Sequence, residues 1–148
     1  MEHSRIIAAS GHDAIVYKIT GRYKIMNLSR LMRSRPRVFD LYCDMRFSGS
    51  PWADMRFMAW NKRGYGVCMK GIANEIREDT NNGRPGEESL YFALKRRIGD
   101  VVVVASYRRE PLIDGIRGFD NANWSQGKRK LVYWFRDLQR ILLRRVVL

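Results

Sequence analysis

Cysteine and histidine are scarce in this chain, and their scarcity excludes several kinds of site. The 148 residues include two cysteines, Cys43 and Cys68, and two histidines, His3 and His12. One pair of cysteines gives no disulfide framework and favours a reducing compartment. No cysteine or histidine spacing resembles a zinc site. We therefore expect an intracellular protein with no metal and no cofactor.

Long apolar runs are also missing. No segment approaches the about 20 consecutive apolar residues that a membrane-spanning helix requires. The N-terminal sequence lacks a basic start followed by an apolar stretch, so it does not resemble a secretion signal. The sequence therefore predicts a soluble protein without a membrane partner.

Acidic residues are few compared with basic ones. The chain has 15 Asp and Glu against 28 Lys and Arg, which gives a formal net charge of +13. An excess of this size attracts polyanions over long distances, so nucleic acid or an acidic protein surface is the expected type of partner. Apolar residues still make up 45% of the chain, which is enough for one folded domain over residues 1–148.

The hydrophobic pattern predicts an α+β fold with a mainly antiparallel sheet. Short β-prone runs indicate strands, and segments with helical spacing of apolar residues indicate helices. The predicted strands lie at 4–9, 13–19, 37–47, 55–59, 65–72 and 100–107. The predicted helices lie at 28–35, 89–98 and 128–148.

For two of the predicted strands, the sequence also predicts which faces are buried. In 37–47 apolar residues alternate with Asp40, Tyr42, Asp44 and Arg46, which predicts one face on the core and one in solvent. The run at 100–107 is rich in valine, which predicts a central strand buried on both faces.

Motifs for catalysis are absent as well. His12, an aspartate and Cys68 could be assembled into a nucleophilic triad on paper, but no nucleophile elbow or glycine-rich oxyanion motif accompanies them. The segment Gly115–Gly118 lacks the glycine count and the strand-to-helix setting of a phosphate-binding loop. We therefore expect a binding protein and no enzyme.

The C-terminal segment 128–148 is a basic amphipathic helix. One side of this helix is apolar and consists of Leu131, Trp134, Phe135, Leu138, Ile141, Leu142 and Val146. Basic residues lie at its start and along the opposite side, namely Lys128, Arg129, Lys130, Arg136, Arg140 and Arg144. They could follow the phosphates of double-stranded RNA, or they could simply form a solvated helix face.

The segment 109–127 is long for a loop and unusually apolar. Either it folds back onto the sheet or it offers anchors to a partner. The candidate partner-binding residues in it are Ile113, Asp114, Ile116, Phe119 and Trp124.

The segment SLYFALKRRI, residues 89–98, places Leu90, Leu94 and Ile98 one above another on a helix. Ser89 is a good N-cap residue for this helix. The three aliphatic side chains form a narrow ridge that either packs into the core or faces a partner. Truncating Leu90 to alanine distinguishes these alternatives. The change costs about 2 to 5 kcal/mol of stability if Leu90 lies in the core, and it leaves the fold intact if Leu90 faces a partner.

The ridge resembles the elongin-binding box of cullin-ligase substrate receptors, in which a leucine, usually a cysteine, and an aliphatic residue follow each other at four-residue intervals. Leu94 stands where that box usually has cysteine. A small, basic chain with such a helix and a long apolar loop resembles the N-terminal suppressors of RNA silencing of dicistroviruses. The resemblance implies a protein of the host cytoplasm that inhibits insect Argonaute through the 109–127 loop. It also implies that the ridge binds elongin B/C and a cullin ubiquitin ligase. The alternative is a basic suppressor that shields double-stranded RNA.

Overall fold

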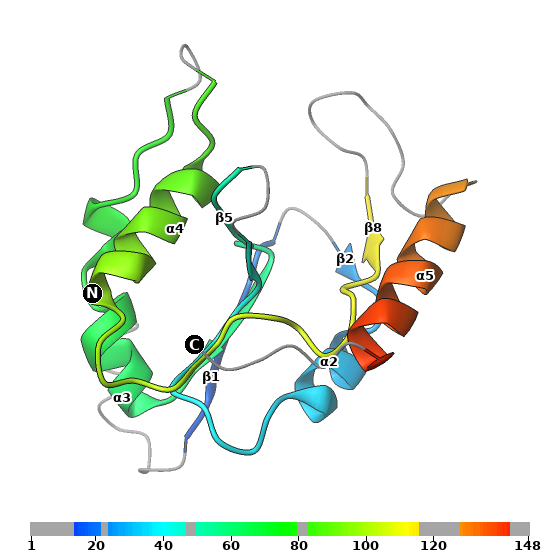
Figure 1. Ribbon diagram of the computed structural model, residues 1–148, viewed down its shortest axis with the longest axis horizontal. Helices are drawn as coiled ribbons and strands as arrows, with labels where there is room; N and C mark the ends of the chain where they lie inside the picture. Colours follow the sequence, from blue (N-terminus) through cyan, green and yellow to red (C-terminus); the bar gives the residue numbers. More distant parts are fainter. Residues whose placement is uncertain (1–13, 22–23, 47–49, 80–82, 116–127, 143–148) are drawn as a thin grey trace.

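The computed structural model of the chain describes residues 14–21, 24–46, 50–79, 83–115 and 128–142, with side chains from residue 131 onward in the last segment (Figure 1). The strands are β1 (Val16–Ile19), β2 (Lys24–Ile25), β3 (Leu41–Tyr42), β4 (Met45–Arg46), β5 (Trp52–Ala53), β6 (Phe57–Trp60), β7 (Val103–Val104) and β8 (Ile113–Asp114). The α-helices are α2 (Leu28–Ser34), α3 (Lys62–Gly64), α4 (Gly86–Arg97) and α5 (Lys128–Leu142).

The fold is α+β, as predicted, and its main sheet has four strands in the order β1-β6-β3-β7. The β1–β6 and β6–β3 pairs are antiparallel, whereas β3 and β7 are parallel. Two smaller antiparallel pairs, β2–β8 and β4–β5, complete the strand pairing of the described residues. The prediction of a mainly antiparallel sheet is therefore confirmed.

The main sheet is buried on both faces. Along β6, Met58 and Trp60 belong to a first buried cluster, while Phe57 and Ala59 belong to a second one. Side chains alternate between the two faces of a strand, so the two clusters lie on opposite faces of the sheet. Helix α4 covers the first face, and Figure 1 shows α2 and α5 on the other side of the strands.

Burial on both faces corrects the expectation for residues 37–47. Tyr42 and Asp44 were expected in solvent, yet both are buried. Tyr42 packs in the second cluster, where its ring lies edge-on to that of Tyr107 at 5.7 Å. The two-residue period holds from Leu41 to Cys43, whereas Phe39 packs in the second cluster together with Tyr42. Because the sheet is covered on both sides, Tyr42 faces a second core and not solvent.

Two further strand predictions need correction. Val101, Val103 and Val104 are buried as expected. The strand β7, however, lies at the edge of the main sheet and not at its centre, because among the described residues it pairs with β3 alone. Residues 65–72 are helical: α3 is followed by a π-helical turn, η1 (Tyr65–Met69), and a 3₁₀ turn, η2 (Ile72–Asn74).

The helical start at Lys62 has a local cause. The side-chain oxygen of Asn61 accepts a hydrogen bond from the Gly64 N–H at 2.8 Å, which is the geometry of an N-cap. At Gly64 the chain passes the backbone of Asp40 so closely that a Cβ would lie 1.9 Å from that carbonyl oxygen. Asn61 therefore begins a helix that can pack this closely against Asp40 only because residue 64 is glycine.

The predicted helix after residue 27 is confirmed as α2, which ends at Ser34 before Pro36. β1 lies within the predicted strand at 13–19. The predicted strand at 4–9 lies outside the described residues.

Candidate interaction surface on helix α5

Helix α5 docks on the domain through its polar side. Tyr133 is buried, and Asp137 accepts two hydrogen bonds of 2.9 Å, one from the Arg109 side chain and one from the backbone N–H of Glu110. Arg140 forms ion pairs with Asp44 and Glu110. The positions 133, 137 and 140 lie on one face of a helix, because they are four and three residues apart.

Arg140 is the centre of this docking. Its Nη2 lies 2.9 Å from Oδ2 of Asp44, and its Nε donates to Oε2 of Glu110. Both carboxylates are almost completely buried. The guanidinium also lies 5.6 Å from the centre of the Tyr107 ring, within the range of a cation–π contact.

The network keeps Arg140 charged. Burial alone would lower the pKa of the guanidinium, but the hydrogen bonds and charges of Asp44 and Glu110 outweigh burial and raise that pKa above its ordinary value. The two buried carboxylates in turn need a cation, since an unpaired buried charge costs several kcal/mol. The pairing therefore sets which side of α5 faces the domain.

The opposite side of α5 is apolar and exposed. We call it the α5 outward face. Leu131 and Trp134 have exposed fractions of 71% and 70%, and the remaining members are more than a third exposed. The α5 outward face consists of Leu131, Trp134, Phe135, Leu138, Ile141 and Leu142.

The sequence left two alternatives for the arginines, contact with RNA phosphates or a solvated helix face. The structure instead has Arg140 against the domain and Trp134 outside. Helical periodicity says which residues share a face, but not which face docks. The signal that could have revealed the orientation is Asp137, the one acidic residue in α5, together with the acidic residues Asp44 and Glu110 in otherwise apolar or turn-like segments.

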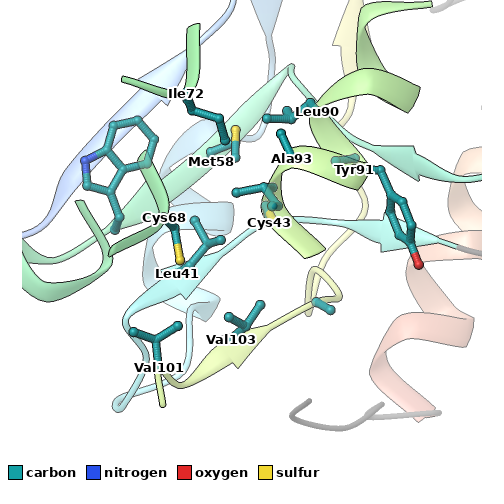
Figure 2. Close-up of a cluster of buried hydrophobic side chains, with 14 residues drawn as sticks. Leu41, Cys43, Met58, Cys68, Ile72, Leu90, Tyr91, Ala93, Val101 and Val103 are labelled. Carbon is teal, nitrogen blue, oxygen red and sulfur yellow. The ribbon is translucent and has the colours of Figure 1, made fainter. Parts of the chain in front are cut away.

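The ridge on α4 is part of the core. Leu90 and Leu94 are buried in the first cluster, and Ile98 packs against it. Figure 2 shows Leu90 and Ala93 of α4 in the same cluster as Met58 of β6 and Cys43, which directly follows β3. The burial of Leu90 and Leu94 favours the core-packing alternative for this ridge, while Ile98 is only partly buried.

The start of α4 also differs from the prediction. The helix begins at Gly86, so Ser89 lies inside its first turn and is not the N-cap. The Ser89 hydroxyl oxygen instead accepts a hydrogen bond from the backbone N–H of Arg77 at 2.9 Å. Ser89 thus ties the preceding segment to the helix.

The first part of the 109–127 segment folds back onto the domain. Glu110, Pro111 and Ile113 are buried, and β8 pairs with β2 through Ile113 and Ile25. Ile113 is therefore not an exposed anchor, whereas Asp114 is half-exposed opposite Lys24. The other candidates, Ile116, Phe119 and Trp124, lie outside the described residues.

The candidate RNA-binding arginines do not form one free stripe. Arg140 is paired inside the network, and Arg136, whose side chain is 53% exposed, lies 3.9 Å from a carboxylate oxygen of Glu110. Lys128, Arg129 and Lys130 form the first turn of α5, and Arg144 lies outside the described residues. Because its guanidinium is paired with Asp44 and Glu110, Arg140 is not free to bind an RNA phosphate in this arrangement.

Other chemistry on the described part of the chain is limited. Burial raises the pKa of the Cys43 and Cys68 thiols, so both stay protonated and are poor nucleophiles. No group of three or more histidine, cysteine or acidic side chains suited to a metal ion occurs among the described residues. A cavity of about 420 Å³ beside α4 mixes arginines with carboxylates and is lined by Arg77, Asp79, Arg84, Pro85, Glu88, Ser89, Phe92 and Arg96.

None of the described helices has the length and apolar character needed to cross a bilayer.

Comparison of the chain with protein-family models, with curated proteins and with solved structures finds no match. Among the described residues, the α5 outward face is the largest group of exposed large apolar side chains.

Proposed function

We propose that the protein acts by binding, as an adaptor without catalysis, and that the α5 outward face is its contact surface. The observation that supports this proposal is the exposure of Leu131 and Trp134 at 71% and 70% on a helix whose polar side is docked. Soluble domains seldom expose a contiguous row of large apolar side chains unless it contacts a partner.

The mode of docking strengthens the proposal. An amphipathic helix held by apolar packing would bury its apolar side, whereas α5 is held by Arg140, Asp137 and their partners. The charged network costs desolvation, and hydrophobic docking would avoid that cost. Its effect is to hold the apolar side outward, where Trp134 and Phe135 provide the aromatic anchors typical of contact surfaces.

Photo-crosslinking tests the contact surface. Benzoylphenylalanine in place of Leu131 should give covalent adducts in insect cells, the host that the resemblance implies. The matched control is the same residue in place of Val38, which is 73% exposed and lies far from α5 in sequence. Equal adduct yields from the two positions would show that the α5 outward face is not a contact surface.

We also propose that this adaptor suppresses RNA silencing by inhibiting Argonaute. The proposal rests on the resemblance to dicistrovirus suppressors, and one observation favours it. The segment that carries Phe119 and Trp124 starts at β8, which is paired with β2, and ends at α5, which is docked through Arg140. Both ends of a partner-binding segment are therefore held by the fold. Recruitment of elongin through α4 is not part of this proposal, because Leu90 and Leu94 are buried.

A silencing reporter in insect cells tests the suppressor proposal. The wild-type protein should restore reporter expression, and the double variant Phe119→Ala/Trp124→Ala should lose most of this effect. Phe92→Ala, which removes an aromatic ring from an exposed position on α4, is the control and should keep it. A wild-type protein without effect, or a double variant with full effect, would rule out suppression through this segment.

A further inference from the structure

We infer that the α5 outward face binds an anionic lipid surface, with α5 lying in the plane of the membrane interface. This inference rests on the proposed contact surface and names its partner. It departs from the sequence-based expectation that the protein has no membrane partner, because a helix can lie on a bilayer without crossing it.

The apolar side of α5 has the composition that such helices use. Its members are aliphatic except for Trp134 and Phe135, and tryptophan is enriched where hydrocarbon meets headgroups. With 15 residues, α5 is roughly 22 Å long, which suits a helix on the surface and is too short for a span. Because the polar side is docked, the apolar side stays exposed from Leu131 to Leu142.

The charge of α5 is the second feature that favours lipid. The first turn carries Lys128, Arg129 and Lys130 and no acidic residue. Cations at a helix N-terminus oppose the helix dipole, which favours negative charge there. A layer of anionic headgroups would relieve this repulsion and would also attract the net charge of +13.

The other candidate partners, double-stranded RNA and a second copy of the chain, each match either the apolar side of α5 or its basic first turn, but not both. Double-stranded RNA would neutralise the basic first turn but would leave Trp134 and its neighbours in water. A second copy of the chain would cover the apolar side but would bring together two proteins of net charge +13. An anionic bilayer covers the apolar side chains and neutralises the cations in the same contact.

Vesicle co-sedimentation with the full chain tests this inference. Binding to phosphatidylcholine vesicles with about 30% phosphatidylserine should be about 100-fold tighter than binding to pure phosphatidylcholine, because each of three basic residues gains from the surface potential. The double variant Trp134→Ser/Phe135→Ser should bind the anionic vesicles about 10-fold or more weakly. Phe92→Ser removes an exposed aromatic ring from another helix and should bind like wild type.

Fluorescence gives an independent measurement. Tryptophan emission should shift to the blue when anionic vesicles are added, and Trp134→Phe should lose the shift while keeping vesicle binding. Equal binding to neutral and anionic vesicles, or equal binding of wild type and the double variant, would overturn the lipid inference.

The remaining outcomes separate this inference from the contact surface itself. If the wild type ignores vesicles but forms a dimer that Trp134→Ser/Phe135→Ser dissociates, the partner is a second copy and the contact surface stands. If it ignores vesicles but crosslinks to a protein from Leu131, the partner is a protein and the contact surface again stands. If Trp134→Ser/Phe135→Ser equals the wild type in vesicle binding, self-association and crosslinking, both the lipid inference and the proposed contact surface fail.

Discussion

Replacing Arg140 with methionine is expected to lower the free energy of unfolding by about 3 to 5 kcal/mol. Methionine keeps much of the side-chain volume but removes the charge. Asp44 and Glu110 would then stay buried without the cation that pairs with both. Removing one partner of a buried ion pair costs more than the pair contributes, because the remaining charge is left uncompensated.

Urea denaturation of the wild type and the Arg140→Met variant measures this loss. Arg136→Met is the matched control on the same helix, since its side chain is 53% exposed and lies 3.9 Å from Glu110. An exposed ion pair of this kind contributes less than about 1 kcal/mol, so the control should be nearly as stable as wild type. Equal losses for the two variants would mean that Arg140 does not hold α5.

A second-site change sharpens the test. If the loss comes from the unpaired carboxylates, neutralising both by Asp44→Asn and Glu110→Gln should recover part of the stability of Arg140→Met. Hydrogen exchange should also show faster exchange of α5 amides in Arg140→Met than in wild type, because the helix loses its anchor. If the two neutralising changes recover stability but the α5 amides of Arg140→Met exchange as slowly as in wild type, the lost stability comes from elsewhere in the domain.

The α5 result shows what the sequence could and could not predict. Spacing alone correctly grouped Leu131, Trp134 and Phe135 on one side of a helix. Which side docks depends on Asp44 and Glu110, which are distant in sequence and become neighbours of Arg140 only in the fold. A local pattern carries no information about such long-range pairs, so the orientation could not be predicted.

The same limit applies to the sheet. The alternation in 37–47 was detected, but the burial of Tyr42 requires a second covering layer, which residues far along the chain such as Val104 and Tyr107 supply. At 65–72 the β-branched and aromatic residues favoured a strand, and the Asn61 cap with the close approach at Gly64 overrode that local preference. Overall class was predictable because it depends on composition and period, which are local.

Truncating Leu94 to alanine is expected to lower the free energy of unfolding by about 2 to 5 kcal/mol. Leu94 is completely buried between α4 and the sheet, so the change removes core contacts and leaves a cavity. Phe92→Ala on the same helix is the control and should lose less, because Phe92 is 42% exposed. Thermal and urea unfolding measure both variants.

This prediction also decides how the resemblance to an elongin-binding box is understood. A ridge made for a partner would tolerate Leu94→Ala with an intact fold and would lose only the binding. A ridge made for the core loses stability first, and any loss of binding then follows from the unfolded fraction. Unchanged stability in Leu94→Ala would show that the ridge is not needed for the core and could serve a partner. The expected loss of stability would explain the leucine spacing by core packing alone.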